Sequence, residues 1–138
     1  MKFIREYVEN IDIGMMQNIH AHLYGSAEIN ESSKILLWTM NYASYEACPY
    51  YYAEIFLGTY VIDNKVVSCA LLGEVSGGGD APYWSDVMLT SEMDKEGFRT
   101  LRVSRSGGEE DEDGNELVEN SKTDIYINIT PEGFVVEK

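Results

Sequence analysis

Apolar residues near the start of the chain recur every three or four positions, which is the spacing of an amphipathic helix. Two such sets are present: Phe3, Ile4, Tyr7, Val8 and Ile11, followed by Met15, Met16, Ile19 and Leu23. The second set stops at Gly25, and glycine commonly follows the last residue of a helix. We therefore expect two short helices, or one helix bent at Gly14, before a polar connection at residues 26–33.

The segment from residue 34 to residue 47 has two interpretations. Ile35, Trp38, Tyr42 and Tyr45 lie three or four positions apart, and a serine before them is a suitable helix N-cap. The continuous apolar run at residues 35–40 is also typical of a buried strand. We favour the helix, which Pro49 would terminate.

From Tyr51 onward the pattern indicates β-structure. Residues 53–62 and 66–72 are rich in β-branched and aromatic side chains, and Asp63-Asn64-Lys65 between them predicts a tight turn. Because this hairpin is apolar on both faces, we expect it at the centre of a sheet covered by the helices. Four further strands are predicted near residues 84–90, 98–104, 124–130 and 134–136.

These elements predict a single α+β domain over residues 1–138, a usual length for one domain. A mainly helical part, residues 1–48, would pack on a five- to six-stranded, mainly antiparallel sheet in residues 51–138. An acidic loop at residues 105–122 would interrupt that sheet.

The charge of the chain narrows the classes of partner. There are 24 acidic and 10 basic side chains, a formal net charge of −14, and the pI is near 4.3. Such a surface repels nucleic-acid phosphates and anionic membranes and attracts basic protein surfaces. No stretch approaches the ~18 consecutive apolar residues of a membrane-spanning helix. We expect a cytoplasmic protein with no direct contact to nucleic acid or membrane.

Three segments resemble metal or phosphate sites only in part. On the predicted helix, His20 and His22 diverge by about 200° and cannot share a metal, whereas on a strand they would share a face. Residues 76–79 are Ser-Gly-Gly-Gly, but Asp80 and Pro82 follow where a phosphate loop needs lysine and a helix, so we interpret them as a flexible loop.

The acidic segment also fails as a calcium loop. With Glu109 at the first position, Asp111 and Asp113 take the third and fifth positions and Gly114 the sixth. The twelfth position, which needs a bidentate glutamate, is Asn120. The sequence thus predicts no metal site and no cofactor.

Catalysis is not indicated by any motif. Neither Cys48 nor Cys69 lies beside a histidine in the sequence, and no Gly-x-Ser-x-Gly motif is present. We interpret the two cysteines as reduced core thiols, with a disulfide between them as the alternative. No catalytic residue is assigned, and we favour a protein that is not an enzyme.

The leading hypothesis is a non-catalytic acidic interaction module, an inhibitor or antidote that engages a basic, nucleic-acid-binding protein by mimicking the charge of nucleic acid. The predicted partner-binding residues are seven carboxylates and three consecutive tyrosines, a residue type frequent in interfaces: Glu109, Glu110, Asp111, Glu112, Asp113, Glu116, Glu119, Tyr50, Tyr51 and Tyr52. The alternative is a small-ligand-binding or enzymatic domain with a site between helices and sheet, lined by Trp38, the tyrosines and Trp84, with His20 or His22 as a polar contact. A third hypothesis is an acidic subunit or scaffold.

Overall fold

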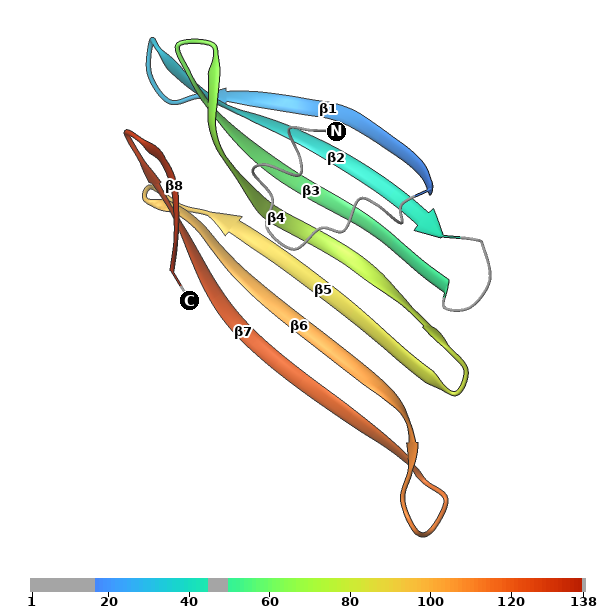
Figure 1. The fold of residues 1–138 in the computed structure, drawn as a ribbon. Coiled ribbons are helices and arrows are strands. Elements are labelled where there is room, and N and C mark those ends of the chain that lie inside the picture. The colour runs from blue at the N-terminus through green and yellow to red at the C-terminus, as the bar shows by residue number, and fades with distance from the viewer. Residues whose placement is uncertain (1–16, 45–49, 138) are drawn as a thin grey trace.

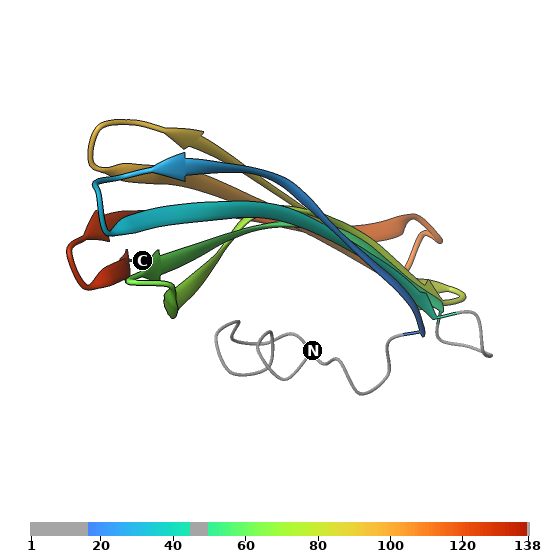
Figure 2. The same cartoon turned by 90° about the horizontal axis from the view of Figure 1, so that it is seen from above.

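The computed structural model describes residues 17–44 and 50–137, which form one antiparallel sheet of eight strands. The strands are β1 (Gln17–Glu28), β2 (Ser33–Ser44), β3 (Tyr50–Ile62), β4 (Lys65–Asp80), β5 (Tyr83–Met93), β6 (Gly97–Glu110), β7 (Glu116–Thr130) and β8 (Gly133–Glu137). Each strand pairs with the next along the chain, so the sheet is a simple meander (Figure 1). From above, the strands form a strongly twisted, curved layer (Figure 2).

The predicted α+β fold class is wrong, because the part of the chain that the structure describes contains strands and no helix. Residues 17–28 and 33–44, assigned above to the mainly helical part, are the strands β1 and β2. The sheet has eight strands where five to six were predicted, and no helix among the described residues covers it. The helix expected near residues 2–10 lies outside the described residues. No described helix is long and apolar enough to span a membrane.

The central hairpin is confirmed. β3 and β4 occupy the third and fourth positions of the sheet, and the turn between them places Asp63 at φ 49° and Asn64 at φ 60°. Two consecutive residues with positive φ define the type I′ turn, whose twist matches that of the flanking strands. Strands are also found at each of the four other places where the sequence predicts them, as β5, β6, the later part of β7, and β8.

β3 is buried on both of its faces. Its odd-numbered residues and their neighbours form the first core, whose buried members are Met40, Ala53, Ile55 and Leu57, with Trp38 and Leu71 packed against them. The second core lies on the opposite face of β3 and contains Ala70, Leu72 and Ile127, with Phe56, Phe98 and Phe134 around them. Burial on both faces explains why the sequence of this hairpin is apolar without alternation.

A β-bulge at Leu72 changes the face of the sheet to which alternate residues of β4 point. Leu57 pairs with Leu71 and Phe56 pairs with Gly73, so Leu72 has no opposite residue in β3. As a result Glu74 lies opposite Ile55 while Ala70 lies opposite Gly58, although alternation alone would keep Glu74 and Ala70 on one face. The first half of β4 therefore directs Ala70 and Leu72 into the second core, while Cys69 and Leu71 pack against the first.

β8, the last strand of the chain, packs against the second core. It pairs with only the last part of β7, from Tyr126 to Thr130, and then lies against β3 and β4. The backbone N–H of Phe134 donates to Oγ of Ser68 at 2.9 Å, and the Phe134 ring meets the Tyr60 ring edge-on at 5.5 Å. The meander thus folds back on itself near β8, at the upper left of Figure 1.

Candidate functional site

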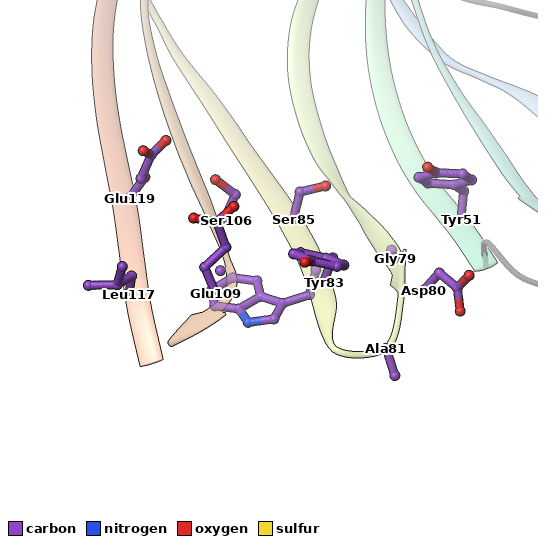
Figure 3. Close-up of a pocket in the computed structure, with 13 residues that line it drawn as sticks. Tyr51, Gly79, Asp80, Ala81, Tyr83, Ser85, Ser106, Glu109, Leu117 and Glu119 are labelled. Atoms are coloured by element: carbon purple, nitrogen blue, oxygen red, sulfur yellow. The ribbon is translucent and has the colours of Figure 1, made fainter. Parts of the chain in front are cut away.

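A groove of about 710 Å³ crosses the other end of the sheet, near the β4–β5 turn (Figure 3). Five strands, β3 to β7, contribute to it, and no residue lining it is basic. The lining residues are Tyr51, Gly78, Gly79, Asp80, Ala81, Tyr83, Trp84, Ser85, Ser106, Gly107, Glu109, Leu117 and Glu119.

Strand register brings five of these positions, one from each strand, into one line across the sheet. Tyr51 pairs with Gly78, Gly78 with Ser85, Ser85 with Ser106, and Ser106 with Glu119. Directly paired residues share a face of an antiparallel sheet. The row therefore has a tyrosine at one end, a carboxylate at the other, and only small side chains between them, which leaves the middle of the face open.

A second row runs beside the first, one step nearer the turns. Asp80 pairs with Tyr83, and Glu109 pairs with Leu117. A register shift between Ser106 and Glu109, where Gly107 and Gly108 have no partner in β7, brings Glu109 onto the same face as Ser106. Tyr83 is 58% exposed and Tyr51 is 45% exposed, so both rings are accessible to a partner.

Trp84 is fixed at the border of the groove. Its indole N–H donates to Oε1 of Glu116 at 2.6 Å, a bond that joins β5 to β7 across β6. Gly107 lies under the indole, because a Cβ at this position would stand 2.8 Å from Nε1 of Trp84. Any side chain at this position would have to displace the indole or the Glu116 carboxylate from these places.

The flexible loop predicted at residues 76–79 is wrong. Residues 76–80 belong to β4, and only Ala81 and Pro82 form the turn to β5. The glycines are needed for close approach: a Cβ on Gly77 would lie 2.9 Å from the carbonyl oxygen of Ser85 and 3.1 Å from the hydroxyl of Tyr52. The acidic loop expected at residues 105–122 is likewise a β-hairpin, because β6 continues to Glu110 and β7 begins at Glu116.

The groove carries three carboxylates, from Asp80, Glu109 and Glu119. Arg105 of β6 is the chain neighbour of Ser106. It donates two hydrogen bonds, of 3.0 and 2.7 Å, to the carboxylate of Asp86 on the neighbouring strand β5. This hydrogen-bonded ion pair lowers the pKa of Asp86 and raises that of Arg105. Arg105 is therefore paired and, as the neighbour of Ser106 in β6, lies on the opposite face of the sheet, so it does not neutralise the carboxylates of the groove.

Of the ten predicted partner-binding residues, three line the groove: Tyr51, Glu109 and Glu119. Two others have structural roles. Glu116 holds Trp84, and the Asp111 carboxylate accepts the backbone N–H groups of Asp113 and Asn115 at 2.9 and 2.8 Å, which lowers its pKa.

The other five predicted residues lie outside the groove. Glu110, Glu112 and Asp113 are exposed at the tip of the β6–β7 hairpin, which projects beyond the β4–β5 turn in Figure 1. Tyr52 lies on the opposite face from Tyr51, over Gly77. Tyr50 begins β3, and its side chain is outside the described set.

Sequence reasoning missed the central residues of the groove. Asp80, Tyr83, Ser85 and Ser106 come from two segments interpreted as loops and one strand, and only the register of four strand pairs brings them together. The available signal was the strand predicted near residues 84–90, because extending it to Tyr83 places Tyr83, Ser85 and Val87 at alternate positions and so on one face. It places these residues on a strand, but it does not identify their neighbours.

The histidine pair is also placed differently from the prediction. His20 and His22 lie on β1 and share a face, since they pair with Asn41 and Thr39, and both are exposed. The argument that helical geometry separates them is therefore wrong. Even so, across residues 17–44 and 50–137 no three His, Cys, Asp or Glu side chains assemble as metal ligands.

The alternative ligand site, between helices and sheet, is not assembled among the described residues. Trp38 packs on the first core, where its indole N–H donates to Oγ1 of Thr59 at 2.9 Å, whereas Trp84 borders the groove. Cys69 is a free thiol close to Thr59, and burial raises its pKa. The alternative of a disulfide between Cys48 and Cys69 is not tested, because Cys48 lies outside the described residues.

Comparison of the chain with protein-family models finds no match, and comparisons with curated proteins and with solved structures find no significant similarity. The groove itself is therefore the feature from which a function is inferred.

Proposed function

We propose that this chain is a non-catalytic acidic module that binds a basic protein surface, and that the groove is where the partner's lysine or arginine side chains enter. The observation that supports the proposal is the composition of the groove: three carboxylates, the exposed rings of Tyr51 and Tyr83, Trp84 at its border, and no basic residue. A guanidinium or ammonium group is attracted both by carboxylates and by the faces of aromatic rings.

The shape of the groove agrees with a protein partner. It is a shallow depression over several strands, floored by glycine and serine, and it is open to long side chains from a flat surface. The three carboxylates are held at fixed positions on β4, β6 and β7, so they form an ordered array. Such an array takes the place of phosphates on a nucleic-acid-binding protein, which makes an inhibitor or antidote the favoured biological role.

A hexa-arginine peptide tests the proposal by isothermal titration calorimetry at 50 mM NaCl. We expect binding by the wild-type chain, no binding of hexa-glutamate, and a marked loss of affinity at 300 mM NaCl, because exposed ion pairs are screened by salt. Replacing two groove carboxylates, as in the double variant Glu109→Gln and Glu119→Gln, should weaken binding about fivefold.

The matched control is the double variant Glu112→Gln and Asp113→Asn at the tip of the hairpin. It removes the same charge from exposed positions outside the groove. If the two variants weaken binding equally, the general negative field binds the peptide and the groove does not. If hexa-arginine fails to bind at 50 mM NaCl, the proposed function is wrong.

A further inference from the structure

The groove reaches an open edge of the sheet. β6 pairs with β7 along its length, but on the outer side of β7 the short strand β8 covers only Tyr126 to Thr130. Among the described residues no strand pairs with the outer side of β7 between Glu116 and Asp124, and these residues are exposed. Leu117 and Glu119, which line the groove, belong to this uncovered part.

An uncovered edge presents unpaired backbone N–H and C=O groups, to which another extended chain can add as a strand. The other edge of the sheet, β1, is less suitable for this purpose. Its pairing with β2 has register shifts between Gln17 and His20 and between Leu23 and Gly25. β7, by contrast, pairs with β6 in unbroken register from Glu119 to Asn128, and its one register shift lies at the hairpin end, between Leu117 and Glu119.

A strand added to β7 would continue the rows of the groove. The row that ends Ser85, Ser106, Glu119 would gain a residue opposite Glu119, on the groove face of the sheet. Because alternate side chains of a strand point to one face, every second residue of the added strand would lie on that face. A long basic side chain there lies beside Glu119 and within one row of Glu109.

The net negative charge of the β7 edge favours a basic segment as the strand that adds to it. Glu116, Glu119 and Asp124 outnumber the one basic residue, Lys122, between Glu116 and Asp124. Two β7 edges brought together would place two segments of net negative charge side by side, so like charge disfavours a second copy of the chain. An extended basic segment has the opposite charge and satisfies the same backbone groups.

We propose that the β7 edge from Glu116 to Asp124 binds an extended segment of the partner as a ninth strand, with basic side chains at alternate positions facing the groove. The inference rests on the proposed function and specifies how the basic partner is held: backbone hydrogen bonds supply pairing, and the groove supplies selection for lysine or arginine.

The test uses the full chain and a nine-residue peptide in which lysine alternates with valine. Two derivatives carry backbone N-methyl groups, one on every lysine and the other on every valine. In an added strand only alternate N–H groups face β7, so one derivative should lose at least about tenfold in affinity and the other should bind within about twofold of the parent. Binding of the parent should also slow amide hydrogen exchange at residues 116–124.

Each contrary result has a distinct meaning. An equal response to the two methylation patterns overturns strand addition, while the basic-partner proposal stands because side chains alone then hold the peptide. Protection of β1 in place of β7 overturns the location. If the lysine–valine peptide does not bind, the inference is wrong, and if hexa-arginine also fails, the proposed function is wrong with it.

Discussion

At the scale of single residues, the groove depends on glycines, which have no side chain to fill the space between neighbouring strands. Gly79 lies between Tyr50 of β3 and Trp84 of β5 in the register, and a Cβ built on it would collide with the carbonyl of Tyr83. Backbone atoms cannot move aside as a flexible side chain can. The pairing of Asp80 with Tyr83, and with it the second row of the groove, requires glycine here.

The first prediction concerns this position. Gly79→Ala should destabilise the chain by roughly 1–3 kcal/mol, the usual cost of forcing an additional carbon into a packed site, and should weaken hexa-arginine binding. Thermal unfolding and calorimetry measure the two effects. Gly25→Ala on β1 is the matched control, because a Cβ there meets nothing within 4 Å. Equal stability of the two variants would show that the close contact at Gly79 is not required.

At the scale of secondary structure, the β3–β4 turn defines the register of the central hairpin. Asn64 has φ 60°, a left-handed conformation that most residues adopt only with strain. Glycine adopts it without strain, and Asn-Gly and Asp-Gly are the preferred pairs in type I′ turns.

We therefore expect Asn64→Gly to raise the free energy of unfolding by up to about 1 kcal/mol, and Asn64→Ala to lower it by about 1 kcal/mol. Urea unfolding of both variants beside the wild type provides the measurement. The turn lies at the far end of β4 from the groove, so peptide affinity should be unchanged. A decrease in stability with glycine would contradict the assigned turn geometry.

The same elements show what could be predicted from the sequence. The hairpin β3–β4 was predictable because its turn residues and its β-branched content agree. β2 was not, because both faces are buried: Ile35 lies on one face and Met40 on the other, so the apolar run lacks alternation. The positions of Trp38 and Tyr42 then match a helical spacing by coincidence, and the long-range pairing with β3 decides the outcome.

β1 was unpredictable for the opposite reason. It is an edge strand whose described side chains are largely exposed, with Leu23 at 70% and Tyr24 at 77%, so its apolar positions do not report a buried face. The groove was partly predictable: the sequence identified Glu109, Glu119 and Tyr51, but Ser85 and Ser106 join them only through strand register.

At the scale of the whole molecule, the net charge of −14 acts on folding and on binding with opposite signs. Repulsion among the carboxylates opposes the folded state, which holds them closer together than the unfolded chain does. The same negative charge also attracts a basic partner. Salt screens both interactions, since the Debye length decreases from about 30 Å at 0.01 M to about 8 Å at 0.15 M.

The last prediction follows from these opposite signs. Raising NaCl from 10 to 300 mM should increase the Tm of the free chain by a few degrees and, over the same range, decrease its affinity for hexa-arginine. Differential scanning calorimetry and titration calorimetry on one preparation measure both quantities.

The double variant Glu112→Gln and Asp113→Asn should show a smaller rise in Tm, because it removes two of the carboxylates clustered at the tip of the β6–β7 hairpin. A Tm that falls with salt would mean that favourable ion pairs, such as Arg105 with Asp86 and Arg99 with Asp94, outweigh the repulsion, and that the surface carries less unbalanced charge than the sequence implies.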